Sequence, residues 1–260
     1  MTVSDTADLK DIEGLVLREF KYKESSKIME IFTRDLGRIS VIARGVLNKN
    51  STNLGLSQRF VLADFSFFRS GKNFYGLKDG SIKKSYFKNK DFDIILYMSA
   101  MADLLLRTID DGQRDGVYRL LINSFEALDR AGGGEINIFL AFFIKYVSFS
   151  GFRPNFKTCG ICGKKIRGRD LYFSVRESSL VCEDCKHLAE DKTYLRPEEY
   201  VYFNKLLYTP SDELSQIKLI PTYKKIGLLI INYCLKSLDL SRYSSIDWVI
   251  KALERNMNVL

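Results

Sequence analysis

The chain has 260 residues, of which 46% are hydrophobic, so it can bury sizeable cores and has room for two or three domains. Forty lysines and arginines against 32 aspartates and glutamates give a net charge of +8, which favours a polyanionic partner without identifying one. The most apolar stretch, 136–147, is interrupted by Asn137 and Lys145 and is too short to span a bilayer. We therefore exclude a membrane span there and predict a buried helix.

The first part of the chain, residues 12–85, is predicted to form β-strands. Stretches rich in β-branched and aromatic residues, with partial polar–apolar alternation, occupy 14–18, 26–33, 37–44, 59–68 and 73–77. Residues 34–37 suit a hairpin turn, with Gly37 supplying a positive φ. About five short strands in a segment of this size suit a small closed barrel, of which the OB-fold is the commonest. An SH3-like barrel is the structural alternative.

From residue 91 the hydrophobic period becomes helical. Helices are predicted over 94–106, 117–128, 135–150, 200–207, 223–238 and 246–253. Gly151 suits the cap of the third helix, and Cys234 is predicted to be a small buried hydrophobe.

These elements predict an α+β multidomain protein. An N-terminal OB-fold β-barrel for nucleic-acid binding covers residues 1–85, and an all-helical domain covers 86–153 and 197–260. A four-cysteine zinc module, 154–196, is inserted between the two helical parts. Because the module has little apolar content of its own, its stability is expected to depend on the metal.

Four of the five cysteines form two Cys-x-x-Cys pairs, Cys159 with Cys162 and Cys182 with Cys185. Two intervening residues let both sulfurs of a pair converge on one ion, and the gap between the pairs fits a small ribbon. Glycines beside the first pair allow the tight turn that a metal site needs. We therefore predict one structural Zn²⁺, because four thiolates close the position that a catalytic zinc keeps open.

Two other interpretations of the cysteines are structural disulfides and a redox pair. The N-terminal residues are polar and acidic and give no export signal, so we expect a reducing cytoplasm, which disfavours disulfides. A redox pair would not need duplication. His187, the only histidine, could replace Cys185 as a ligand, or it is simply a solvated residue beside the site.

The sequence favours a binding protein without catalytic residues over an enzyme. Catalytic Ser-His-Asp and Cys-His arrangements need a histidine, and the single histidine of this chain lies beside the cysteine pairs. The sequence therefore disfavours both arrangements. The patterns of zinc deaminases, of P-loops and of dinucleotide-binding loops are missing from the sequence.

Basic residues of the barrel segment are candidates for binding phosphates. On an alternating strand Arg38 and Arg44 would share one face, while Ile39, Val41 and Ala43 would point to the core. Arginines on such a face can neutralise phosphates, and nearby aromatic rings can stack on bases. The other interpretation is an ordinary solvated face.

Several segments, in this order, are similar to one bacterial family. Gly-Leu-Val-Leu at 14–17, Phe-Thr-Arg-Asp-Leu-Gly at 32–37, Ala-Arg-Gly at 43–45, Gly-Phe-Arg-Pro-Asn-Phe-Lys-Thr-Cys-Gly-Ile-Cys-Gly at 151–163 and Leu-Val-Cys-Glu-Asp-Cys at 180–185 resemble the RecO recombination mediators. The resemblance covers nearly the whole chain. It departs from the family after Gly45, where a denser basic stretch is often found.

The resemblance implies a DNA repair and recombination protein in the cytoplasm, associated with the nucleoid. It implies binding of single- and double-stranded DNA, annealing of complementary strands, and partnership with RecR. It also implies binding to the acidic tail of single-stranded DNA-binding protein, through an apolar slot rimmed by cations, and loading of RecA. Arg44, within the matching Ala-Arg-Gly, ranks first among the expected DNA contacts, followed by Arg38, Arg18 and Lys49. A zinc-ribbon transcription or adaptor protein without annealing activity is the alternative.

Overall fold

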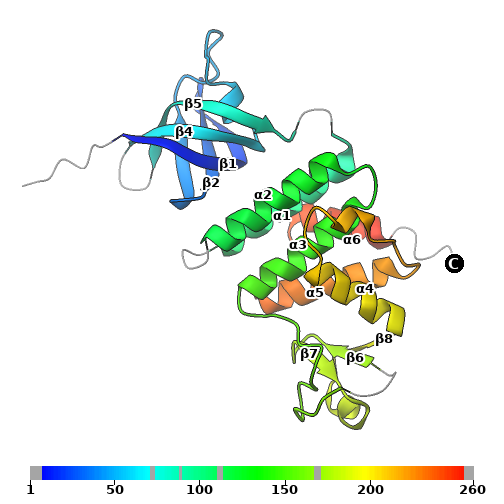
Figure 1. The fold of residues 1–260 in the computed structure, drawn as a ribbon. Coiled ribbons are helices and arrows are strands. Elements are labelled where there is room, and N and C mark those ends of the chain that lie inside the picture. The colour runs from blue at the N-terminus through cyan, green and yellow to red at the C-terminus, as the bar shows by residue number, and fades with distance from the viewer. Residues whose placement is uncertain (1–7, 71–73, 88–89, 110–113, 167–170, 255–260) are drawn as a thin grey trace, which may run out of the picture. The chain divides into compact units, whose positions relative to one another are not determined.

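The computed structural model describes residues 8–70, 74–87, 90–109, 114–166 and 171–254 (Figure 1). The chain divides into two compact units. The first comprises Met1–Ile95 with Ala102–Tyr118, and the second comprises Leu96–Met101 with Arg119–Leu260. Within the described ranges, no helix combines the length and the apolar character that crossing a membrane requires.

The first unit is built on five strands, β1 (Leu9–Tyr22), β2 (Ser26–Thr33), β3 (Gly37–Ala43), β4 (Val61–Arg69) and β5 (Tyr75–Ser85). β1 pairs with both β2 and β4, and β5 pairs with both β3 and β4, so the order β1-β2-β3-β5-β4 closes into a barrel. Among the described strands of the barrel, β3 and β5 pair in parallel and the other pairs are antiparallel. A strand-rich N-terminal domain before a helical region confirms the predicted α+β class.

Alternation along β3 explains how the strand contributes to the barrel core. Ile39, Val41 and Ala43 are buried, whereas Arg38, which lies between the hairpin turn and Ile39, is exposed. Gly37 has a φ of 70°, which confirms the predicted hairpin turn. β1 begins earlier than predicted, at Leu9, because an irregular register between Leu9 and Ile12 obscures its alternation. The last predicted strand starts among residues 71–73, which lie outside the described ranges.

Six α-helices follow, and each overlaps a predicted one: α1 (Phe92–Thr108), α2 (Arg114–Arg130), α3 (Glu135–Phe149), α4 (Pro197–Tyr208), α5 (Tyr223–Ser237) and α6 (Ser244–Glu254). Short 3₁₀ turns lie at η1 (Gly55–Ser57) and η3 (Leu214–Gln216). α3 is the buried helix predicted from its composition, and Asn137 on it is satisfied by the carbonyls of Leu214 and Ile217. Gly151 follows α3 with a φ of 94°, and Cys234 is fully buried, both as predicted.

Between α3 and α4 the chain forms a small sheet of β6 (Leu171–Ser174), β7 (Ser179–Val181) and β8 (Lys192–Leu195), in the order β7-β6-β8, with the 3₁₀ turn η2 at Glu183–Leu188. Phe173 on β6 packs its ring 5.4 Å from the rings of both Phe203 on α4 and Tyr233 on α5. The ring centre of Phe156 lies 5.1 Å from that of Phe203. The segment is therefore anchored to the helices by an aromatic cluster, which the sequence analysis did not anticipate.

Candidate metal centre and basic residues of the barrel

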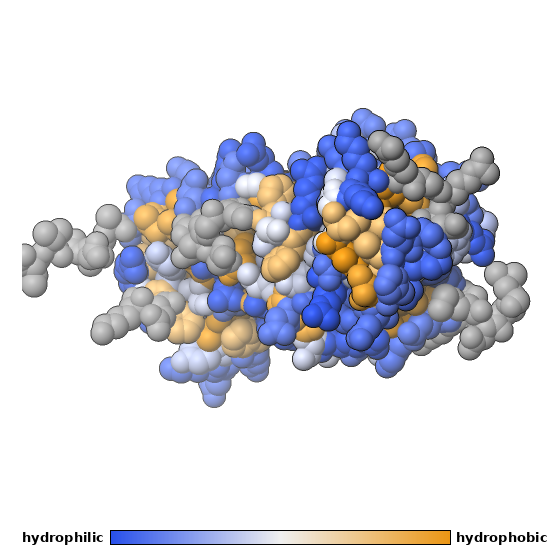
Figure 2. All heavy atoms as spheres, turned by 90° about the horizontal axis from the view of Figure 1, so that it is seen from below, coloured by the Kyte–Doolittle hydropathy of each residue, from blue (hydrophilic) through white to orange (hydrophobic). Residues whose placement is uncertain are grey.

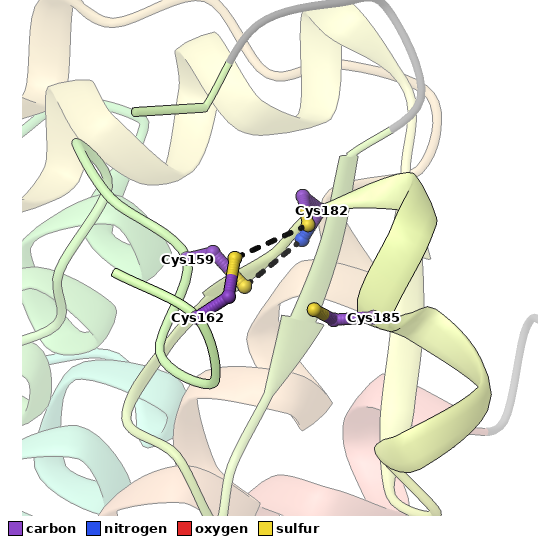
Figure 3. A group of neighbouring side chains, drawn as sticks. All are labelled: Cys159, Cys162, Cys182 and Cys185. Carbon is purple, nitrogen blue, oxygen red and sulfur yellow. Dashed lines mark hydrogen bonds between the residues drawn. The ribbon is translucent and has the colours of Figure 1, made fainter. Parts of the chain in front are cut away.

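The four paired cysteines converge on one point of the second unit (Figure 3). The sulfurs of Cys159, Cys162, Cys182 and Cys185 all lie within 4.8 Å of one another, and those of Cys162 and Cys182 are 3.8 Å apart. All four cysteines are free thiols. This arrangement could hold a metal ion, because four soft donors face a common centre.

Two tight turns bring the sulfurs together. In the first, the N–H of Gly163 donates to the carbonyl of Cys159 at 2.9 Å, and Gly163 has a φ of 71° that favours glycine. Gly160 serves a different need, since a side chain there would lie 2.9 Å from the Cβ of Ser179. In the second turn, the N–H of Cys185 donates to the carbonyl of Cys182 at 3.0 Å. The predicted role in a tight turn is therefore confirmed for Gly163, whereas Gly160 permits the close approach of Ser179 instead.

The environment prepares one sulfur to be a thiolate. Burial raises the pKa of Cys159, but the backbone N–H groups around its sulfur outweigh burial and lower that pKa to about 6. The Cys182 N–H is one of them, at 3.4 Å. Burial and hydrogen bonding with the other three thiols raise the pKa of Cys185 to about 12. A bound cation would favour the deprotonated form of all four thiols.

His187 does not belong to the sulfur cluster. It lies exposed in η2, and the groups that converge among the described residues are the four cysteines alone. The cluster has a small core of its own, in which Val181 and Ala189 pack with the buried cysteines. His187 therefore fits the interpretation of a solvated neighbour.

Two of the four predicted DNA contacts are bonded to α1 within the first unit. Arg18 forms a salt bridge with Asp103 at 2.9 Å, and Arg38 donates to the carbonyl of Leu106 at 2.6 Å. Arg59 adds a longer contact to Asp103, at 3.9 Å. These pairs could not be predicted from the sequence, because α1 is far from the barrel strands along the chain.

The other two predicted contacts, Arg44 and Lys49, are exposed on the segment that follows β3. Arg44 donates to the hydroxyl of Ser70 at 3.2 Å, a neutral partner that leaves its charge uncompensated. In the described structure neither residue forms a salt bridge. Arg44 is therefore the predicted arginine whose charge is most available to an anion.

The fold and the cysteine cluster define a multidomain protein with an N-terminal sheet domain and a helical domain that carries a potential metal site. Comparison with known families then shows which family the chain belongs to. Residues 9–86 match the family model described as "Recombination protein O N terminal", and residues 89–238 match "Recombination protein O C terminal". The chain belongs to this RecO family of DNA repair and recombination proteins.

Individual relatives agree. The chain is 29% identical over 209 residues to the DNA repair protein RecO of Caldicellulosiruptor saccharolyticus, covering 80% of this chain and 84% of that protein. It is 29% identical over 237 residues to the DNA repair protein RecO of Clostridium acetobutylicum, covering 87% of this chain and 94% of that protein. It is 30% identical over 176 residues to the DNA repair protein RecO of Caldicellulosiruptor bescii, covering 67% of this chain and 71% of that protein.

Proposed function

We propose that Cys159, Cys162, Cys182 and Cys185 bind one structural Zn²⁺. Zn–S bonds of about 2.3 Å in a tetrahedron separate the sulfurs by roughly 3.8 Å. The Cys162 and Cys182 sulfurs already have a separation of 3.8 Å, and the remaining pairs lie within 4.8 Å. The ion would tie the turn at Cys159 to η2. Four thiolates leave no open position for a substrate, so the role of the zinc is structural.

We also propose that the barrel, residues 1–85, is an OB-fold that binds DNA. The strand order β1-β2-β3-β5-β4 and the parallel β3–β5 pair support this assignment. The helical domain is assigned to 86–153 and 197–260, with the zinc module at 154–196 between its parts. Arg44 and Lys49 are the leading DNA contacts, while Arg38 and Arg18 would first have to exchange their partners on α1 for phosphates.

The function proposed on this basis is that of a non-enzymatic recombination mediator. It binds single- and double-stranded DNA, anneals complementary strands and, with RecR, helps to load RecA on DNA coated by single-stranded DNA-binding protein. The observation that carries the proposal is the succession of both RecO family matches along one chain. Basic surfaces that screen two phosphate backbones would let the strands approach without covalent chemistry.

A groove on the second unit suits the acidic, apolar-ended tail of single-stranded DNA-binding protein. A cavity of about 560 Å³ is lined by Leu228, Leu235 and Ile250 from α5 and α6. Its charged lining residues are Lys225, Arg242 and Glu254. Lys225 is held by Glu199 at 2.7 Å, so Arg242 is the cation available to a peptide carboxylate. Titration of the tail peptide against wild type and Arg242→Ala tests this site, and equal affinities would place the receptor elsewhere.

Annealing of complementary strands coated with single-stranded DNA-binding protein is the decisive experiment. A mediator accelerates pairing, whereas a zinc-ribbon adaptor, the second candidate, binds DNA without doing so. Arg44→Ala should lower the slope of log affinity against log salt by about 0.7 for a single strand. Arg130→Ala removes the same charge from a pair with Glu126 in the second unit and should leave the slope unchanged.

A further inference from the structure

The described part of the second unit exposes a group of aromatic rings at the ends of two helices. Figure 2 shows a face that is mainly hydrophilic, with hydrophobic residues in small groups. The exposed fractions of Phe149, at the end of α3, of Phe152, just after it, and of Tyr208, at the end of α4, are 41%, 42% and 52%. Large exposed aromatic rings that lie together commonly mark a binding surface.

Two contacts join the helix ends that carry these rings. The ammonium group of Lys145 donates to the carbonyl of Thr209, and Phe149 lies one helical turn after Lys145 on the same side of α3. The Arg153 guanidinium lies 5.2 Å from the centre of the Tyr208 ring. The last turns of α3 and α4, and the segment after α3, therefore share one surface.

The charges of this surface are positive and available. Arg153 and Lys205, one turn before Tyr208 on α4, are exposed. In the described structure neither forms a salt bridge, in contrast to Arg18 on the barrel. The nearby Asp212 interacts electrostatically with Lys145. An anion approaching the Tyr208 ring would thus meet uncompensated cations.

We propose that this aromatic–basic patch, defined as Phe149, Phe152, Arg153, Lys205 and Tyr208, is a second binding surface for single-stranded nucleic acid. Flat, exposed rings between cations accept bases by stacking and phosphates by charge, without sequence preference. An acidic peptide with an apolar end is better matched by the aliphatic groove between α5 and α6. The inference rests on the proposed function and deepens it, because annealing requires two strands to be held by one protein.

The experiment compares full-length wild type with the double variant Tyr208→Ala/Arg153→Gln. Annealing of two complementary strands should slow by about tenfold, since loss of one stacking ring alone costs on the order of a factor of ten. Affinity for one short single strand should change by less than about twofold, because the barrel still binds it. Tyr208→Phe keeps the ring and should anneal as wild type does.

Trp248→Ala/Lys251→Gln is the matched control. This pair on α6 has the same chemistry, with the lysine 5.3 Å from the ring centre, but is not part of the patch. It should leave annealing unchanged. Thermal unfolding of each variant checks that these exposed changes preserve the fold.

Photocrosslinking of a bromouracil-containing single strand to the wild type gives a readout that does not depend on annealing. Crosslinks should map to the peptides that contain Phe152 or Tyr208 as well as to the barrel. Crosslinks confined to the barrel, or annealing by the double variant at the wild-type rate, would contradict the proposal that the patch binds single-stranded nucleic acid. A double variant that loses affinity for an acidic peptide instead would assign the patch to a protein partner. Wild type that crosslinks through the patch but does not anneal would refute the proposed mediator function and leave the patch standing.

Discussion

The barrel and the cysteine module are both small β structures, but their interiors differ in kind. The barrel core is made of aliphatic and aromatic side chains from all five strands, among them Val16, Met29, Val41 and Phe65. The buried core around the sulfurs consists of Cys159, Val181, Cys185 and Ala189. Burial of apolar area stabilises the first. The second buries only Val181, Ala189 and two thiols, with Ile161, Ile166 and Tyr172 partly buried against them, so we expect its stability to depend on a cation.

The comparison indicates that the module is stabilised by aromatic packing and, as we propose, by a metal ion. On one side the sulfurs converge, and on the other Phe156 and Phe173 pack on α4 and α5. The barrel has an apolar core of its own, and Phe32 also packs edge-to-face on Tyr118 of α2, with 5.5 Å between the ring centres. Each of the following substitutions or treatments should therefore affect the stability of the two regions to a different extent.

Removal of zinc should have the largest effect. The binding free energy of structural zinc is on the order of 10 kcal/mol and is also folding free energy. Cys162→Ser, or a strong chelator, should therefore unfold residues 154–196 while the barrel keeps slow amide exchange. Metal analysis together with hydrogen exchange measures both results.

The fifth cysteine supplies the control for this prediction. Cys234 is fully buried and lies outside the sulfur cluster, so Cys234→Ala should retain one zinc per chain. Disulfides in place of zinc would reverse the result, since a reductant would then unfold the module and a chelator would not.

A cavity in the barrel should give the opposite pattern. Phe65 is fully buried, and Phe65→Ala should lower the free energy of unfolding by about 3–5 kcal/mol. Zinc content should remain one per chain. Phe20→Ala, at an exposed phenylalanine of β1, should cost far less, and urea unfolding compares the two. Loss of zinc from the Phe65 variant would show that the two regions are not independent.

The sequence predicted most where the signal is local. Period-two burial on β3, the helical period from α1 to α6 and the spacing of the cysteine pairs each depend on neighbours along the chain. The pairing of Arg18 with Asp103 and the anchoring of Phe173 on Tyr233 join residues that are distant in sequence. An arginine on a solvated strand face and an arginine bound to a distant helix have the same sequence pattern, so only coordinates distinguish them.

The aromatic anchor should have an intermediate effect. Phe173→Leu keeps most of the buried apolar area but loses its edge-to-face contacts with Phe203 and Tyr233. The expected cost is about 1–2 kcal/mol, and it should weaken zinc retention against a competing chelator by a similar free energy. Tyr194→Leu, at an exposed tyrosine of β8, is the control. Unchanged zinc retention in Phe173→Leu would mean that metal alone holds the module.

The smallest expected change in stability comes from Asp103→Asn, which sharpens the contrast between paired and unpaired arginines. Arg18 is nearly half exposed, so losing its ion pair should cost less than about 1 kcal/mol. The same change releases Arg18 to bind phosphate, and it also removes the longer contact of Arg59. Affinity for a single strand should rise, and its salt slope should grow by about 0.7 if one further phosphate is contacted. Fluorescence anisotropy at several salt concentrations measures both.

Asp115→Asn provides the control for that measurement, since it releases Arg34, which pairs with Asp115 at 3.5 Å and is not a predicted DNA contact. Its salt slope should equal that of wild type. An equal increase for both variants would mean that any freed charge on the first unit attracts DNA, without a defined site. An unchanged slope for Asp103→Asn would remove Arg18 from the predicted DNA contacts. It would leave Arg44 and Lys49, whose charges no carboxylate compensates in the described structure, ranked ahead of Arg38, which is bonded to α1.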